Sequence, residues 1–332
     1  MRGRSSYYRR KGPDRQSVLA RALEDGGAAV RKRLTSHPGP VRAVAAAAIP
    51  VIVGLTIARK KLRLHPAATL LVACGTPLAA AVAMPPGRAR YAAVAGAYMY
   101  LFKLSWELPY DDPERLRRRL LIDEPIRFDT WIGGGVPPGL RLQRALRKPG
   151  EVTALDIAVT CVYGSWFVPH LVLGYLLVRH EQYVPRAGGR LSAAYHLTTP
   201  FYWLWPEAPP WWASEKEGRM GGELERVARQ VVCHVLHRPP PGEGSVPGNP
   251  WGAMPSDHIS SAAITAMGLG ELGPVYGALG WSYVAAASFA IVYLGEHYVA
   301  DVVVGLAIAE LVRRLEPLAA PVVRATARAV EP

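Results

Sequence analysis

Cysteine is scarce in this chain. Only three occur in 332 residues, and Cys74, Cys161 and Cys233 are far apart in the sequence. A disulfide framework requires several cysteines at close spacing, and a structural zinc site requires clustered cysteine and histidine. The sequence therefore indicates neither a disulfide-rich scaffold nor a zinc-binding module.

Acidic residues are also few relative to basic ones, since 26 Asp and Glu against 39 Lys and Arg give a formal net charge of +13. A nucleic-acid-binding protein would need a folded reading module, and no such motif is present, so we predict no nucleic-acid partner. Residues 1–42 hold many arginines and lack the apolar core of a secretory signal. We predict that they form a basic, disordered arm on the cytoplasmic face, near anionic lipid.

Long apolar runs dominate the rest of the chain, and hydrophobic residues make up 50% of the sequence. A helix needs about 20 apolar residues to cross a bilayer. The runs that approach this length are 43–58, 67–84, 91–106, 154–178, 191–205, 257–272, 275–294 and 298–312. Several are short, so we expect about six of them to span. The alternative, a large soluble helical protein, is not favoured, because runs such as 154–178 are too long and too weakly amphipathic.

A charged stretch and a glycine-rich stretch separate the first three runs from the later ones. The charges of 110–131 cannot lie in hydrocarbon without partners, so we expect this stretch at the membrane interface. The sequence GGGVPPG (133–139) predicts a backbone bend. A phosphate-binding loop is not favoured there, because no strand precedes it and no GK[ST] follows.

Two polar clusters interrupt the last apolar runs, GAMPSDHISSA (252–262) and YLGEHYVADVVVG (293–305). We predict a helix that starts after Pro255, with Ser256 in the capping region and His258 in the first turn. A second helix returns after Gly273, and His297 opens the third. Two crossings bring the chain back to its starting side, so both histidines should lie at one membrane depth. His297 and Asp301, four residues apart, share a helix face.

These residue types together suit phosphoryl transfer through a phosphohistidine. The Asp301 carboxylate would fix the tautomer of His297 and leave the other ring nitrogen free to attack. His258 would give its proton to the leaving oxygen. Ser256 and the amides of the helix N-terminus would receive an anion.

Other interpretations of the same residues remain open. Each histidine could be structural, the pair of His297 and Asp301 could hold a metal ion, or it could relay protons in a transporter. The rival function is a non-enzymatic lipid-binding or proton-coupled transport protein. A transporter usually places ionisable residues in broken helices near the bilayer midplane, whereas these histidines lie at helix ends, which favours the enzyme.

With both clusters in view, the chain resembles the type-2 phosphatidic acid phosphatase (PAP2) superfamily over residues 127–312. PSDH and YLGEHYVADVVVG carry the resemblance. PEAPPWW (206–212) is similar to the Pro-x-x-Pro-Pro-aromatic motif of the inositolphosphotransferase branch and its bacterial relatives. GGGVPPGLRLQ looks like the bent segment that precedes the core in that branch.

The resemblance implies a nucleophile at His297, its orienter at Asp301 and an acid–base partner at His258. It also implies an all-α, polytopic membrane protein with a six-helix core, no metal or organic cofactor, and a site on the extracytoplasmic side of the cell membrane. We therefore expect N-terminal membrane helices and an interfacial segment in 43–126, the catalytic membrane domain in 127–316 and a basic tail in 317–332.

The sequence departs from the superfamily pattern in three places. Ile291 stands six residues before His297, where many relatives carry an arginine. The Lys-x6-Arg-Pro phosphate clamp is missing. Asp257 stands where relatives usually carry an uncharged residue, and a carboxylate beside an anionic substrate is unfavourable unless it pairs with a cation of the neighbouring loop.

Other residues must then bind the phosphate. The loop after PPWW offers Lys216, Arg219, Arg226 and Arg229. We favour Arg226 or Arg229, on a predicted helix over 221–232, and a solvated charged face is the alternative. The predicted phosphate-binding set is completed by Ser256, Pro209, Pro210 and Trp211. The expected substrate is a phospholipid or an isoprenoid-lipid phosphate among membrane lipids, and the acceptor is water or a polyol such as inositol.

The distribution of basic residues bears on sidedness. The side opposite the site carries Arg179, Arg186, Arg190, Arg313 and Arg314, which makes it the predicted cytoplasmic side. The argument is weakened by the basic residues that fall on the side of the site, Arg141, Arg144, Arg147 and Lys148.

Overall fold

The computed structural model describes residues 38–148, 150–239 and 248–330, together with residues 28, 32 and 36. In these residues the chain is helical, and extended pairing is limited to isolated bridges between Leu121 and Glu207 and between Glu207 and Gly252. The predicted all-α class is confirmed. Most of the predicted arm 1–42 lies outside the described residues, but 38–42 begin the first long helix, so the arm ends earlier than predicted.

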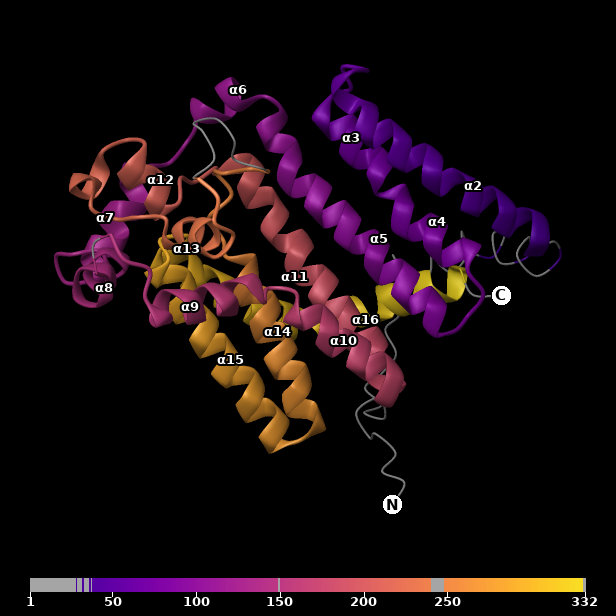
Figure 1. Cartoon of the computed structure of the whole chain (residues 1–332). Coiled ribbons are helices and arrows are strands. Elements are labelled where there is room, and N and C mark those ends of the chain that lie inside the picture. Colours follow the sequence, from indigo (N-terminus) through magenta and orange to yellow (C-terminus); the bar gives the residue numbers. More distant parts are fainter. Residues whose placement is uncertain are drawn as a thin grey trace.

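The N-terminal part is a layer of helices on one side of the molecule (Figure 1). Its longer helices are α2 (Pro38–Ile57), α3 (Pro66–Ala73), α4 (Gly75–Ala83) and α5 (Arg88–Glu107). Helix α4 packs between α2 and α5. Short turns follow in η2 (Ala58–Lys60), η3 (Leu108–Asp111) and α6 (Pro113–Arg117). Arg59 ties two of these turns together, with its Nε 2.7 Å from Asp111 Oδ2.

The middle of the chain bends twice. Helices α7 (Asp123–Ile132) and α8 (Pro138–Leu146) flank the predicted bend, where Gly134 and Gly135 adopt φ of 63° and 103°, a conformation that favours glycine. The run 154–178, predicted as one helix, forms α9 (Ala154–Gly164) and α10 (Val168–Arg179), bent by 51°. Ser165 lies at the break, where its carbonyl oxygen accepts a hydrogen bond from the Tyr283 hydroxyl at 2.9 Å.

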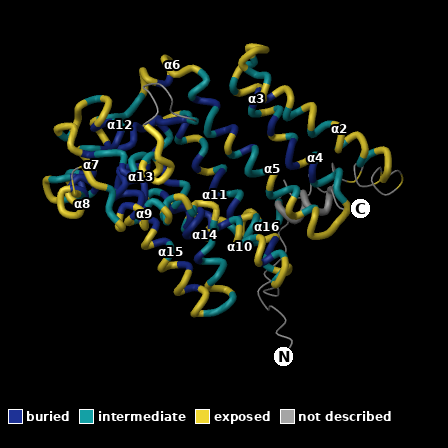
Figure 2. Tube along the Cα trace, in the orientation of Figure 1, coloured by how far each residue is buried: buried dark blue, intermediate teal, exposed yellow. Residues whose placement is uncertain are grey.

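The core lies in the second half of the chain. Helix α11 (Val184–Leu204) is followed by short helices α12 (Pro210–Glu215), η5 (Arg219–Gly222) and α13 (Val227–Val235). Helices α14 (Asp257–Leu272) and α15 (Pro274–Tyr293) form an antiparallel hairpin, and α16 (Val299–Val330) packs against α14 and α11. Figure 2 shows buried backbone concentrated where these helices meet. Buried members of this core include Ile259, Ala263, Ala266, Ala287 and Ile291.

Two helices in this part are longer than the apolar runs in the sequence. Helix α11 starts at Val184 rather than 191, because the glycines and arginines before Leu191 are helical too. Helix α16 runs on past residue 312 through Pro317 and Pro321, so the predicted tail 317–332 continues this helix as far as Val330.

Fewer helices than expected meet the length and composition of a membrane span. Among the described residues these are Pro38–Lys60, Pro66–Ala83 and Pro274–Tyr293, with the bent pair α9 and α10 as one further span. The protein is a membrane protein, and among the described residues length and composition alone give three spans, or four with the bent pair, where the sequence analysis expects about six. Helices α11 and α14 carry Arg186, Arg190 and Glu271, which pair with one another and with Glu316 on α16 at 2.6–2.8 Å. These ion pairs place charge in helices that bury their apolar faces against protein.

Small residues let α14 approach both neighbours closely. A Cβ on Gly280 of α15 would lie 2.7 Å from Ala266 Cα, and one on Gly305 of α16 would lie 2.7 Å from the Ser256 carbonyl oxygen. Glycine at such positions allows backbones to pack at distances that side chains forbid. Position 305 therefore fixes the head of α14 against α16.

The close approach at Gly305 can be tested with alanine. The added methyl of Gly305→Ala has to displace backbone, so we expect a loss of about 1–3 kcal/mol in unfolding free energy, as for other overpacked sites. Gly268→Ala on α14 is the matched control, because its Cβ would meet nothing within 4 Å. The control should be neutral or stabilising by up to about 1 kcal/mol. Thermal unfolding of both purified variants in detergent measures this, and equal midpoints would contradict the packing argument.

Candidate active site

The structure brings the two predicted polar clusters together. His258 lies in the first turn of α14 and His297 lies in the loop between α15 and α16. Their rings are 5.6 Å apart between centroids, in an edge-to-face arrangement. The Tyr163 ring of α9 stacks on His258 at 5.0 Å. The two-crossing plan inferred from the sequence therefore gives the right neighbours.

His297 and Asp301 form a hydrogen-bonded pair. The ring Nδ1 lies 3.0 Å from Asp301 Oδ2, and the same oxygen accepts the Tyr298 amide at 3.0 Å. Asp301 is fully buried, whereas His297 reaches the wall of a cavity. Because Nδ1 is held by the carboxylate, Nε2 is the nitrogen left to face a substrate.

A second carboxylate holds the start of α16. Asp129 of α7 accepts the amides of Val299 and Ala300, each at 3.1 Å, which satisfies two of the free N–H groups of that helix N-terminus. Burial raises the pKa of Asp129 to about 6, against the lowering effect of these two hydrogen bonds. Sequence reasoning missed this residue, because nothing in the charged stretch 110–131 marks one acid as buried.

Arg226 is the predicted phosphate ligand that the structure places at the site. Its guanidinium lies 4.2 Å over the Trp211 ring, and its Nε is 2.8 Å from Glu296 Oε1. Arg229, on α13, is not part of the cavity wall, and Arg219 pairs with Asp123 at 2.8 Å. The predicted helix over 221–232 starts only at Val227, because Met220, Gly221 and Gly222 adopt positive φ.

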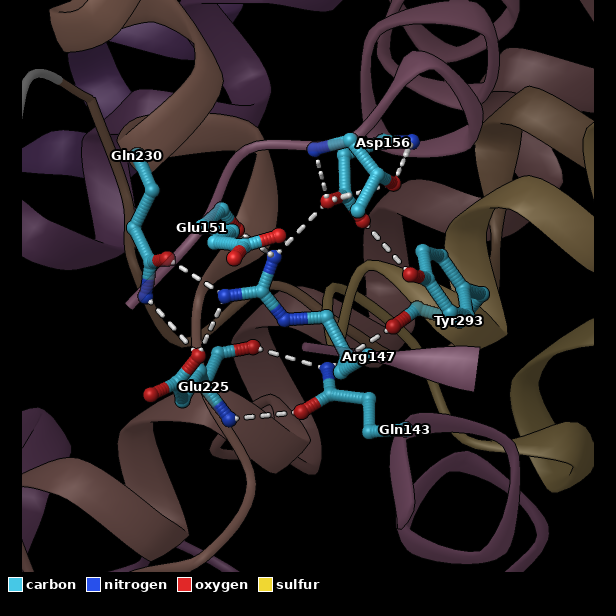
Figure 3. A network of polar contacts seen from close by, with 8 residues as sticks. Gln143, Arg147, Glu151, Asp156, Glu225, Gln230 and Tyr293 are labelled. Atoms are coloured by element: carbon cyan, nitrogen blue, oxygen red, sulfur yellow. Dashed lines mark hydrogen bonds and ion pairs between the residues drawn. The ribbon is translucent and has the colours of Figure 1, made fainter. Parts of the chain in front are cut away.

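A buried polar network fixes the segment before Arg226 (Figure 3). Gln143 of α8 bonds to both backbone groups of Glu225 at 2.9 Å and to the Tyr293 carbonyl at 2.8 Å. Arg147 contacts Asp156 and Glu225 at 3.0 and 2.6 Å. Arg144 is paired as well, with Glu223 at 2.8 Å. Arg144 and Arg147 therefore have structural partners, as do Arg186 and Arg190 on the opposite side, so pairing does not distinguish the two sides.

The cavity beside these residues has a volume of about 760 Å³. Both histidines, Arg226, Pro209 and Trp211 lie on its wall. Aromatic and apolar side chains supply much of the rest, including Met99, Phe102, Trp106, Tyr163, Trp166 and Tyr195. The first three belong to α5. An apolar wall beside a few polar groups suits a ligand with a polar head and an apolar body.

Two predicted phosphate ligands lie behind the wall. Pro210 is buried and does not line the cavity, although its neighbours Pro209 and Trp211 do. Ser256 is fully buried, and its hydroxyl oxygen has no hydrogen-bond partner among the described residues. The serine supports the head of α14 through its backbone, since its amide donates to the Asp301 carbonyl at 3.2 Å.

Asp257 lies on the cavity wall. A cation of the loop would have offset its charge, but the partner that the structure gives it is neutral, since the Tyr202 hydroxyl of α11 donates to Asp257 Oδ2. The hydroxyl also lies 3.1 Å from the Pro255 carbonyl. The other carboxyl oxygen, Oδ1, is buried and has no hydrogen-bond partner among the described residues.

The alternative of a metal site finds no geometric support in the part of the chain that the structure describes. No group of three or more His, Cys, Asp or Glu side chains there is arranged to hold an ion. Within that part, His297 and Asp301 are hydrogen-bonded to each other at 3.0 Å and have no third such side chain placed to complete an ion site.

With this geometry in place, comparison with known proteins gives the class of protein. The family model of the PAP2 superfamily matches residues 126–314, more than half of the chain. The chain belongs to the PAP2 superfamily. Members of this superfamily are phosphatases, which supports an enzyme of the lipid phosphatase type. No curated protein and no solved structure matches the chain.

The burial of Asp129, which outweighs its two hydrogen bonds in setting the pKa, predicts a pH dependence of stability. Its folded pKa of about 6 lies above the unfolded value, so the folded state holds the proton more tightly. Protonated Asp129 therefore makes its full contribution to the free energy of unfolding below about pH 4. This contribution, up to about 3 kcal/mol, is lost as the pH rises through about 6.

Thermal midpoints of wild type and Asp129→Asn between pH 4 and 7 test this. The difference between the two should change over that window, because asparagine does not titrate. Glu124→Gln is the control, an exposed acid on the same helix that should leave the profile of wild type unchanged. A profile of Asp129→Asn parallel to wild type would contradict the assignment.

Proposed function

We propose that this protein is a membrane-embedded lipid phosphatase or phosphotransferase that works through a phosphohistidine at His297. The observation that carries the proposal is the Asp301–His297 pair, which presents the free ring nitrogen to a cavity shared with His258 and Arg226. In the first step His297 Nε2 attacks phosphorus, the phosphorus–oxygen bond breaks, and His258 gives a proton to the leaving oxygen. In the second step His258 takes a proton from the acceptor, whose oxygen replaces Nε2 on phosphorus.

The cavity supports a lipid as the substrate. Its wall combines one arginine beside the nucleophile with aromatic side chains from several helices. The arginine is suited to phosphate, because a planar guanidinium can donate two parallel hydrogen bonds. The substrate class is a phospholipid or an isoprenoid-lipid phosphate, and the acceptor is water or a polyol such as inositol. The PEAPPWW motif at the cavity favours the inositolphosphotransferase branch of the superfamily.

The location and metal requirement belong to the same proposal. We place the protein in the cell membrane with the site on the extracytoplasmic side, because the arginines of the opposite helix ends favour the cytoplasm.

Turnover needs no divalent metal, since Arg226 and the two histidines supply charge and protons. Full loss of turnover in chelator, restored by zinc, would overturn this part.

The reaction is tested with a panel of lipid phosphates, with and without polyol acceptors. Hydrolysis releases phosphate, and transfer gives a phospho-polyol. Both reactions pass through a phosphoenzyme, which should be detected by trapping. Absence of turnover and of a phosphoenzyme across the panel would contradict the proposal. A His297→Ala variant that loses phosphate release but keeps lipid binding would exclude the rival, a non-enzymatic lipid-binding or proton-coupled transport protein.

The roles of the three residues predict different effects of substitution. Asp301→Asn should slow phosphohistidine formation by roughly 100-fold or more, because the imidazole loses its oriented tautomer. The double variant Asp301→Asn, His297→Ala should be little less active than His297→Ala alone, because the effects of residues that act as one catalytic unit are not additive.

His258→Ala should slow the reaction of a natural lipid phosphate far more than that of an activated aryl phosphate, because a good leaving group needs less protonation. Equal slowing of both substrates by His258→Ala would refute its role as the acid.

Arg226 and Arg229 form a matched pair for the phosphate ligand. Arg226→Ala should lower kcat/KM on the order of 100-fold, the scale seen when one donor to a reacting oxyanion is removed. Arg229→Ala should leave it nearly unchanged, because this side chain is not on the cavity wall. Arg226→Lys separates charge from geometry, since lysine cannot make the two parallel bonds. The test is the steady-state kcat/KM of variants that fold with equal thermal midpoints. Equal effects at both positions would contradict the role of Arg226 as the phosphate ligand.

A further inference from the structure

Asp257 lies on the cavity wall, and the proposed mechanism gives it no role. It begins α14, directly before His258, so it is next to the proposed acid in the chain. The Tyr202 hydroxyl donates to Oδ2, whereas Oδ1 has no hydrogen-bond partner among the described residues. Asp257 is thus a carboxyl group at the active site whose hydrogen-bond donor is neutral.

The lysine and the arginine on the described part of the cavity wall already have acidic partners. Arg226 Nε lies 2.8 Å from Glu296 Oε1, and Lys103 Nζ lies 2.6 Å from Glu107 Oε1. In residues 38–148, 150–239 and 248–330, no lysine or arginine forms an ion pair with Asp257. An ionised Asp257 therefore gives the wall an excess negative charge, which repels a phosphate unless a further cation pairs with it.

Two aromatic side chains enclose the same part of the wall. A Cβ on Gly252 would lie 2.6 Å from Trp106 Nε1 and 3.4 Å from Tyr202 Cδ1, so both rings pack against this glycine. The Tyr202 hydroxyl in turn contacts Asp257. Trp106, Tyr202 and Asp257 therefore form one corner of the cavity, which we call the acidic–aromatic corner. An ammonium group suits such a corner, because a carboxylate and the faces of aromatic rings both attract cations.

We propose that the acidic–aromatic corner binds the ammonium group of a zwitterionic phospholipid, a phosphodiester whose headgroup carries that ammonium. The phosphate of the same lipid lies at Arg226 and His297, and its apolar chains lie along the rest of the wall. The inference rests on the proposed function and narrows its substrate class. The ligand supplies the cation for Asp257 that the described part of the chain does not.

Charge distinguishes this lipid from a lipid phosphomonoester. A zwitterionic phosphodiester has one negative charge on its phosphate and one positive charge on its ammonium, so it is neutral as a whole. A phosphomonoester carries nearly two negative charges at neutral pH and brings no cation for Asp257. The corner therefore selects for the zwitterion, and it selects against the monoester by repulsion.

A pair of lipids that differ only in this charge tests the corner. One is a phosphocholine lipid, and the other is its neutral isostere, in which a carbon atom replaces the ammonium nitrogen. Wild type should prefer the charged lipid by about 10- to 100-fold in kcat/KM, the scale of an interaction with a charged group. Asp257→Asn should lose this preference, although it keeps an oxygen that can accept from Tyr202.

The control is Glu217→Gln, which removes an acid that pairs with Arg117 and does not line the cavity. Its ratio of kcat/KM for the two lipids should equal that of wild type. A wild-type ratio near one would overturn the proposal even if Asp257→Asn fails to fold, and so would an unchanged ratio in a folded Asp257→Asn. If Asp257→Asn raised only the KM of a polyol acceptor, the carboxyl would bind the acceptor instead, and the proposal would be wrong.

Binding of the same two lipids to His297→Ala separates this inference from the proposed function, because it needs no turnover. Titration calorimetry in detergent should show the same preference for the charged lipid, and the double variant with Asp257→Asn should lack it. A preference of this kind in a protein that forms no phosphoenzyme would support the corner and reject the proposed function. Equal binding of both lipids by a protein that does form a phosphoenzyme would reject the corner alone.

Discussion

The buried N-terminus of α16 is the constraint on which the site depends. A helix that starts inside a protein presents amides that must find acceptors. Asp129 takes those of Val299 and Ala300, and Asp301 takes that of Tyr298. The same Asp301 oxygen then holds His297. The acceptors that make this helix start possible therefore also place the nucleophile, and the positive end of the helix dipole favours their negative charge.

Carboxyl groups outnumber the cations around this helix start. Asp129 and Asp301 lie at the helix start, Asp257 and Glu296 lie on the cavity wall, and Arg226 already pairs with Glu296. Neutral donors compensate in part, since Tyr202 donates to Asp257 and backbone amides to Asp129. Asp129 and Asp301 are buried and do not line the cavity, whereas Asp257 and Glu296 are the carboxyl groups that a phosphate there would meet. Arg226 remains on that wall, stacked on Trp211, where a phosphate can meet it.

The cavity also joins parts of the chain that differ in origin. The family region begins at residue 126, whereas Met99, Phe102 and Trp106 of α5 lie before it and complete the apolar wall. On the other side, Gln143 and Arg147 tie the segment before Arg226 to α9 and α15. The residues proposed for catalysis thus lie in the family region, and α5, which precedes that region, completes the apolar part of the cavity wall.

The sequence by itself determined the helical class, the pairing of His258 with His297 and the His297–Asp301 contact. The pairing of the histidines follows because two crossings return a chain to its starting side. The His297–Asp301 contact was predicted from a shared helix face, but His297 lies in the loop before α16 rather than opening that helix, and its ring reaches Asp301 from there. It did not determine the break between α9 and α10, the late start of α13, or the role of Asp129. Those depend on which backbone groups lie nearby in space, and Asp129 meets the amides of Val299 and Ala300 across 170 and 171 residues of chain. Burial and hydrogen bonding to distant segments are properties of the packed chain, so only the tertiary structure decides which acids lie on the surface and which hold the site together.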